Sequence, residues 1–107
     1  MFKGKNVLVA GGSGLIGRQL IDLLLLEEAN VVVADLRESG NDSVEHLSMD
    51  LTVYENCRRA CSGMDYVFNL LCAKGSPKSM KERPASHFVP MVLFDTNLMR
   101  AAKDCNV

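Results

Sequence analysis

The feature that most constrains the fold is a glycine-rich segment, residues 11–17 (GGSGLIG), between two apolar stretches. Before it, residues 7–10 (VLVA) form a short run typical of a strand buried on both faces. After it, residues 15–28 carry leucines and isoleucines at helical spacing, with Arg18 and Asp22 between them. The order of strand, glycine turn and helix predicts a βα unit in which glycine permits a tight turn and close helix–strand packing.

The glycines can be grouped in two ways, as Gly12-x-Gly14-x-x-Gly17 or as Gly11-x-x-Gly14-x-x-Gly17. Both groupings leave exposed backbone N–H groups at a helix start, where the helix dipole favours anionic phosphates. The segment therefore predicts a dinucleotide site, and a glycine turn that binds nothing is the less favoured alternative. The residues predicted to hold the pyrophosphate are Gly11, Ser13, Gly14, Leu15, Ile16 and Gly17.

An acidic residue follows the next apolar run, residues 31–34 (VVVA), which predicts a second buried strand. This residue is Asp35, at a position where a carboxylate accepts hydrogen bonds from the adenine-side ribose hydroxyls. A 2′-phosphate would meet a like charge there, so Asp35 favours NAD over NADP. Arg37 weakens that preference, because a nearby arginine can accommodate the extra phosphate.

The middle of the chain continues the alternation of strands and helices, after Asn30 breaks the first helix. Residues 37–43 predict a loop and residues 44–49 a third strand. A short helix is predicted from Thr52, as its cap, through Ser62, and Gly63 follows where a left-handed residue is needed.

The last third of the chain predicts one more strand and one more helix. Residues 66–72 form the fourth strand, residues 74–90 a long, partly irregular connection with all three prolines, and residues 91–105 a helix. Alternation of this kind implies right-handed crossovers and a mainly parallel sheet. The predicted fold is α/β, a single Rossmann-like domain over residues 1–107 with four strands in the order 3-2-1-4. No second crossover helix is evident in residues 37–50.

Composition excludes several other classes of protein. The 107 residues and net charge of −1 predict one domain without affinity for nucleic acid. No stretch reaches the roughly 18 apolar residues of a membrane span, and the N-terminus lacks the pattern of a signal peptide. Cys57 and Cys61 have a tolerable metal spacing, but buried thiols are the favoured interpretation and no metal site is predicted. We expect reduced thiols and a cytoplasmic protein.

The segment 11–17 resembles the glycine motif of extended short-chain dehydrogenases/reductases, the NAD-dependent epimerase/dehydratase group. The resemblance covers almost the whole chain, with further similarity at residues 63–72 (GMDYVFNLLC) and 96–107 (TNLMRAAKDCNV). The cofactor contacts that it implies are Asp50 and Leu51 at the adenine, and Leu70, Leu71 and Cys72 along the cofactor at the end of the fourth strand.

The chain departs from the family pattern in two places. Residues 69–72 are Asn-Leu-Leu-Cys where the family has His-Leu-Ala-Ala, so side chains are bulkier beside the nicotinamide half. The frequent helix asparagine of the family falls on Met91, and Asn97 matches a second asparagine that does not inherit its role.

The resemblance implies a catalytic Tyr-x-x-x-Lys pair beyond a fifth strand, which the chain does not reach. Tyr54-x-x-x-Arg58 imitates this pair but fails, because arginine does not deprotonate. No catalytic residue is therefore predicted. We expect the cofactor-binding N-terminal portion of a longer enzyme that acts on a nucleotide sugar as epimerase, dehydratase or reductase. The alternatives are a stand-alone NAD(H) sensor or docking module, and a remnant that binds nothing.

Three further features of the sequence bear on function. A basic cluster after the fourth strand, Lys74, Lys78, Lys81 and Arg83, is expected to overhang the ligand edge of the sheet, with a solvated surface as the simpler alternative. The histidines His46 and His87 lack a carboxylate pattern, and a catalytic role for them is not favoured. The fourth strand would be an unpaired sheet edge, which predicts self-association.

Overall fold

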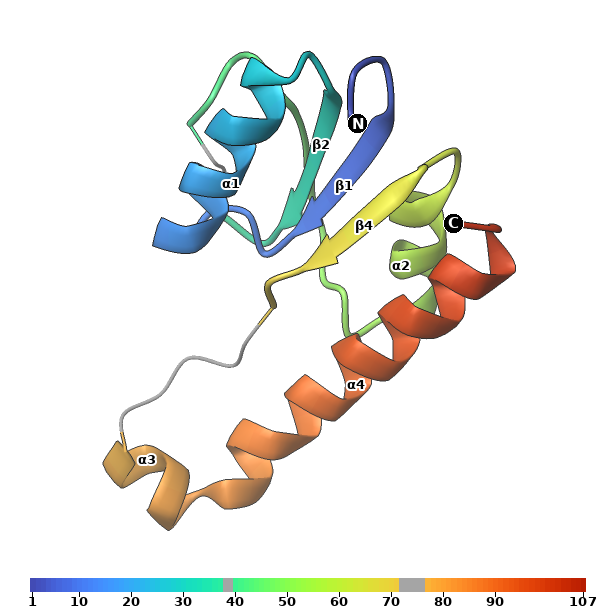
Figure 1. Ribbon diagram of the computed structural model, residues 1–107. Helices are drawn as coiled ribbons and strands as arrows, with labels where there is room; N and C mark the ends of the chain where they lie inside the picture. The colour runs from blue at the N-terminus through green and yellow to red at the C-terminus, as the bar shows by residue number, and fades with distance from the viewer. Residues whose placement is uncertain (38–39, 72–76) are drawn as a thin grey trace.

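The centre of the molecule is a four-stranded parallel sheet in a computed structural model that describes residues 1–37, 40–71 and 77–107 (Figure 1). The strand order is β3-β2-β1-β4, which confirms the predicted order and fold class. All three pairings are parallel, and Val7 and Leu8 of the central strand pair with Val31 and Val32. The strands are β1 (Asn6–Ala10), β2 (Asn30–Asp35), β3 (Glu45–Ser48) and β4 (Tyr66–Asn69).

Helices cover both faces of this sheet. In Figure 1, α1 lies on one face, and α2 lies with the C-terminal part of α4 on the other. The helices are α1 (Leu15–Leu26), α2 (Tyr54–Cys61), α3 (Pro77–Glu82) and α4 (Pro84–Asp104). Within the described ranges, no helix is both long enough and apolar enough to cross a membrane.

The core has two layers because the side chains of β1 alternate between the faces of the sheet. Val7 and Val9 pack with Ile21 and Leu24 of α1, whereas Leu8 packs against the layer of α2 and α4. These three β1 side chains are fully buried, as expected for a strand covered on both faces. The carboxyl end of β1, from which the glycine segment starts, is therefore held by packing on both faces of the sheet.

The prediction for the connection after β4 was wrong. Residues 74–90 were expected to be partly irregular, but α3 occupies Pro77–Glu82 and α4 begins at Pro84. Proline fits the first turn of a helix, where its missing N–H has no partner to lose, and Pro90 lies inside α4. The first turns of α4 and all of α3 extend away from the sheet (Figure 1).

Helix boundaries and faces also differ in detail from the prediction. The α1 helix ends at Leu26, and the left-handed residue after it is Glu28 (φ 62°), while Asn30 already starts β2. Leu15, Ile16 and Leu23 are among the leucines and isoleucines at helical spacing, yet all three are exposed. Helical spacing alone cannot tell which side of an apolar helix the sheet covers.

The α2 helix shows one wrong and one confirmed boundary. Its N-cap is Val53 and makes no side-chain hydrogen bond, so the predicted cap at Thr52 was wrong. The Thr52 hydroxyl instead donates to Asp50 Oδ1 at 2.7 Å. Gly63, after the helix, has φ of +76°, which confirms the predicted left-handed position.

Candidate dinucleotide site

The glycine loop between β1 and α1 is shaped by close backbone approaches. Gly11 has φ of +80°, and a Cβ there would lie 2.9 Å from the Leu70 carbonyl at the end of β4. A Cβ on Gly17 would lie 2.6 Å from Gly12 Cα, so these two glycines bring α1 against the turn. Gly14 differs, because a Cβ there would have no atom within 4 Å. Gly14 therefore faces open space while the other glycines serve packing.

A cavity of about 540 Å³ lies beside this loop, at the carboxyl ends of the strands. The predicted residues that line it are Gly11, Gly14, Asp35, Arg37, Asp50, Leu51, Leu70 and Leu71. Its other lining residues, which the sequence did not single out, are Leu36, Met49, Thr52, Pro90 and Phe94. This edge of a parallel sheet is where ligands of doubly wound folds bind.

Four of the predicted residues that the structure describes are not in this lining. Ser13 is buried in the loop, and Gly17 packs against Gly12. The side chains of Leu15 and Ile16 are 76% and 70% exposed and point away from the core. Cys72 lies outside the described residues.

Asp35 joins the glycine loop to the end of β2. Its Oδ2 accepts a hydrogen bond from the Ser13 backbone N–H at 3.2 Å, and its Oδ1 accepts one from the Arg37 N–H at 3.3 Å. The Ser13 hydroxyl donates to the Arg37 carbonyl at 2.7 Å. The carboxylate is thus fixed at the cavity wall by two backbone amides.

Asp50 provides a second carboxylate at the same cavity. Its Oδ1 accepts hydrogen bonds from the Thr52 hydroxyl at 2.7 Å and the Thr52 N–H at 2.9 Å. These bonds, led by that from the hydroxyl, lower the pKa of Asp50 below its ordinary value of 3.8. Asp50 is therefore a carboxylate at neutral pH.

The far wall of the cavity comes from β4 and α4. The Leu70 N–H donates to the Ala10 carbonyl at 2.8 Å, which continues the β1–β4 pairing past the strand. Asn69 Nδ2 donates to Asp95 Oδ1 at 2.8 Å and so joins the end of β4 to α4. Phe94, one residue before Asp95, is 8% exposed and lines the cavity. The spacing of α4 could place Phe94 on an apolar face but could not say that this face meets a cavity.

A model of the NAD dependent epimerase/dehydratase family matches residues 7–107. The chain belongs to this family. The membership confirms the resemblance inferred from the glycine motif and explains why the cavity and the strand order occur together.

Individual relatives agree with this membership. The chain is 25% identical over 118 residues to a UDP-glucose 4-epimerase of Rickettsia bellii, covering 94% of this chain and 32% of that protein. The UDP-glucose 4-epimerase of Thermus thermophilus in complex with NAD has a similar structure, with a TM-score of 0.83, 30% identity and 95% of this chain covered. Pen from Bacillus thuringiensis has a TM-score of 0.85 at 26% identity, over 100% of this chain.

The match is to part of each relative. The chain covers 35% of the Thermus epimerase and 37% of Pen, so it spans about a third of the length of these family members.

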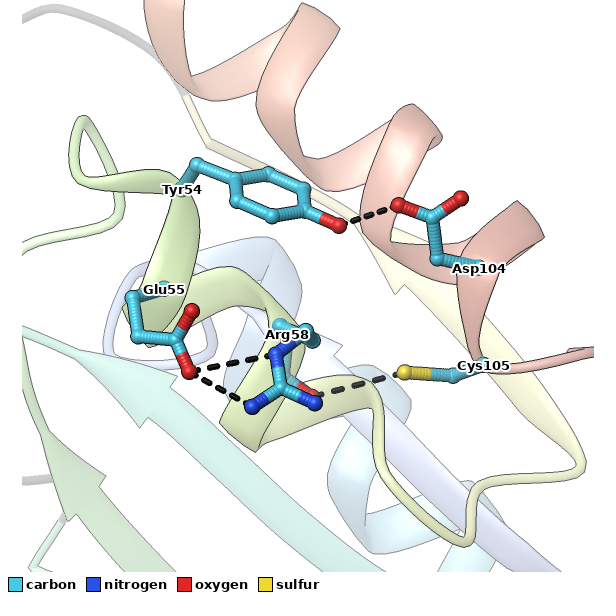
Figure 2. A network of polar contacts seen from close by, with 5 residues as sticks. All are labelled: Tyr54, Glu55, Arg58, Asp104 and Cys105. Carbon is cyan, nitrogen blue, oxygen red and sulfur yellow. Dashed lines mark hydrogen bonds and ion pairs between the residues drawn. The ribbon is translucent and has the colours of Figure 1, made fainter.

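Tyr54 and Arg58, whose spacing imitates the catalytic pair that the resemblance implies, belong to a network of polar contacts between α2 and the end of α4 (Figure 2). The Tyr54 hydroxyl donates to Asp104 Oδ2, and Arg58 pairs with Glu55 at 2.7 Å. The hydrogen bond to Asp104 raises the pKa of Tyr54, so the phenol keeps its proton at neutral pH. The Cys105 thiol lies 3.5 Å from the Arg58 carbonyl. These contacts join α2 to the end of α4, and none of the five residues lines the cavity.

Three further candidates, Cys57, Cys61 and His46, do not line the cavity either. Cys57 and Cys61 are buried, and burial raises the pKa of each thiol to about 11. Among the described residues, no three His, Cys, Asp or Glu side chains are grouped to hold a metal. Both ring nitrogens of His46 are buried without a hydrogen-bond partner in the described part of the chain. The side chain of His87 lies outside the described residues.

The basic cluster is on α3 and just after it. Lys78 forms an ion pair with Glu82 at 4.0 Å, and Lys81 and Arg83 are exposed. None of these three lines the cavity, although α3 lies beyond the carboxyl ends of the strands (Figure 1). Lys74 lies outside the described residues.

Proposed function

We propose that this chain is the NAD-binding portion of a nucleotide-sugar epimerase, dehydratase or reductase and does not turn over substrate by itself. The observation that carries the proposal is the cavity at the carboxyl ends of the strands. Gly14, Asp35 and Asp50, from three separate segments, border the same space. The family description and the Thermus epimerase bound to NAD support NAD as the ligand.

The residues present fit a dinucleotide. Gly14 has open space where a side chain would stand, at the N-cap of α1, which suits a pyrophosphate. The roles proposed for Leu15, Ile16 and Gly17 rest on the segment's backbone N–H groups, because the Leu15 and Ile16 side chains face solvent. For Ser13, contact with the pyrophosphate requires that its N–H or its hydroxyl exchange the bond to Asp35 or to the Arg37 carbonyl. When bound, NAD supplies a hydride acceptor, and this chain supplies binding and orientation.

Asp35 and Asp50 contact different parts of the adenosine half of NAD. Asp35 accepts hydrogen bonds from the ribose hydroxyls and disfavours a 2′-phosphate, so NAD binds more tightly than NADP. Asp50 and Leu51 contact the adenine. Leu70, Leu71 and Cys72 lie along the cofactor, and Arg37 is the residue that could accommodate a 2′-phosphate.

The substrate class and the assembly are proposals of the same kind. Relatives described as UDP-glucose 4-epimerases favour a nucleotide sugar as the substrate of the whole enzyme. Among the strands that the structure describes, β4 pairs with β1 alone, and its other edge favours self-association of this chain. Sedimentation that finds a monomer at high concentration would exclude the association.

We also propose a cytoplasmic location, which suits the free thiols of Cys57, Cys61 and Cys105.

Calorimetric titration with NAD and NADP tests the binding proposal. We expect saturable binding of NAD, weaker binding of NADP, and at least about a tenfold loss of NAD affinity in Asp35→Ala, which removes a charged acceptor. Asp42→Ala is the matched control, because Asp42 is exposed and does not line the cavity. A folded chain that binds neither dinucleotide would refute the proposal.

A further inference from the structure

The loop of residues 50–52, at the cavity, is held by hydrogen bonds to its carbonyl groups. Asn56 Nδ2 donates to the Asp50 carbonyl at 2.8 Å, and the Cys57 thiol donates to the Leu51 carbonyl at 3.1 Å. Both donors lie on α2, which directly follows the loop. Two successive carbonyls are thus bound by side chains of α2.

The third carbonyl of this loop is bound from a distant element. Asn97 Nδ2, on α4, donates to the Thr52 carbonyl at 2.9 Å. The two residues are 45 positions apart, and this partly buried bond joins the 50–52 loop to the helix that carries Phe94. The amide of Asn97 is a neutral donor aimed at a single acceptor, so its loss leaves that carbonyl without a partner.

The same loop presents a free donor beside a free acceptor. Within the described residues, the Leu51 N–H and Asp50 Oδ2 have no hydrogen-bond partner, and both residues line the cavity. Adenine presents the complementary pair on its Watson–Crick edge, an acceptor at N1 next to a donor at N6. Hypoxanthine reverses that pair, with a donor at N1 and an acceptor at O6.

We propose that Asn97 is a positioning residue for adenine recognition, which fixes the 50–52 loop so that its free donor and acceptor match adenine. The inference rests on the proposed NAD site and deepens it, because it makes α4 part of the choice of base. Asn97 does not touch the ligand, and it acts through the backbone of Thr52.

Binding of NAD compared with nicotinamide hypoxanthine dinucleotide tests this inference. Asn97→Asp keeps the shape of the side chain but replaces the donor nitrogen with an acceptor oxygen. We expect the preference for NAD over the hypoxanthine analogue to fall about tenfold, the size of one hydrogen bond to a charged or buried group. Asn97→Gln retains the donor and should recover most of the preference. Asn106→Asp, just past α4, adds the same charge away from the loop and should leave the preference unchanged.

The ratio of the two affinities separates positioning from general stability, because both ligands bind the same folded fraction. If Asn97→Asp does not fold, Asn97→Ala removes the donor without adding charge and decides the question on the same ratio. An unchanged ratio in a folded donor-free variant overturns the inference and leaves the NAD site standing. Failure of the unsubstituted chain to bind either dinucleotide overturns the proposed function, and this inference with it.

Discussion

Two loops meet at the cavity, and they are held in place by opposite means. The glycine loop after β1 is fixed by the absence of side chains, since Gly11 and Gly17 allow backbone to approach backbone, and Gly12 leaves room for the side chain of Val33. The loop of residues 50–52 is fixed by side chains that reach its carbonyl groups from α2 and α4. Adding a side-chain atom should therefore distort the glycine loop, whereas removing a hydrogen-bond donor should loosen the loop of residues 50–52.

The largest effect is expected from Gly17→Ala. The new methyl group would lie 2.6 Å from the backbone of Gly12, so α1 must move away from the turn. We expect a loss of at least about 3 kcal/mol in the free energy of unfolding, measured by chemical denaturation. Gly14→Ala is the control and should cost about 1 kcal/mol or less, because no atom lies within 4 Å. Equal losses in the two variants would contradict the packing role of Gly17.

Cys57→Ala tests the second loop with an intermediate effect. We expect a loss of about 1–2 kcal/mol from the removed buried sulfur and its hydrogen bond to Leu51, together with weaker NAD binding. Cys61→Ala removes an equally buried sulfur from the same helix and should lower stability without changing NAD affinity. NAD affinity is measured by calorimetry and stability by denaturation for both variants. If Cys57→Ala and Cys61→Ala bind NAD with the same affinity, the bond from Cys57 to the 50–52 loop has no effect on NAD binding.

Asn56→Ala should have a smaller effect, because its bond to the Asp50 carbonyl is exposed to water. We expect about 0.5–1 kcal/mol of destabilisation and an NAD affinity reduced less than in Asn97→Asp. Glu55→Ala, one residue earlier, removes only an exposed ion pair with Arg58 and serves as the matched control for affinity. If Glu55→Ala loses as much NAD affinity as Asn56→Ala, the hydrogen bond from Asn56 to the Asp50 carbonyl does not contribute to NAD binding.

The smallest effect concerns the charge of Asp50. Its folded-state pKa is lowered by Thr52, so the stabilisation is present above the ordinary value of 3.8 and is lost as pH falls through the lower folded value. The group is exposed, and we expect only about a few tenths of a kcal/mol. The stability difference between the unsubstituted chain and Asp50→Asn should therefore shrink between pH 5 and the acid limit. A difference that stays constant over that range would exclude the hydrogen-bonded carboxylate as its source.

The same contrast explains what could be predicted from the sequence. The glycine loop was predictable because its constraint is local, so glycine spacing between an apolar run and a helix indicates the turn directly. The bond from Asn97 to Thr52 was not, because it depends on how α4 packs across α2. Sequence similarity even assigned Asn97 to a less functional position.

Other predictions were wrong because the structural preference of a residue type was used without knowledge of the elements that pack around it. Pro84 and Pro90 were taken as signs of irregular structure, yet both lie within α4. Leu15 and Ile16 belong to the apolar residues at helical spacing, but the sheet covers the side of α1 that carries Ile21 and Leu24. The strand order was predicted correctly because parallel strands with crossovers leave few topologies open.

The carboxylate of Asp35 has a practical consequence for following the site in solution. Its two oxygens each accept a backbone amide proton, from Ser13 and from Arg37. Amide protons bonded to a carboxylate resonate downfield in nuclear magnetic resonance spectra and respond when that carboxylate gains new donors. The amides of Ser13 and Arg37 are thus built-in reporters that would register a ribose arriving at Asp35, without any turnover.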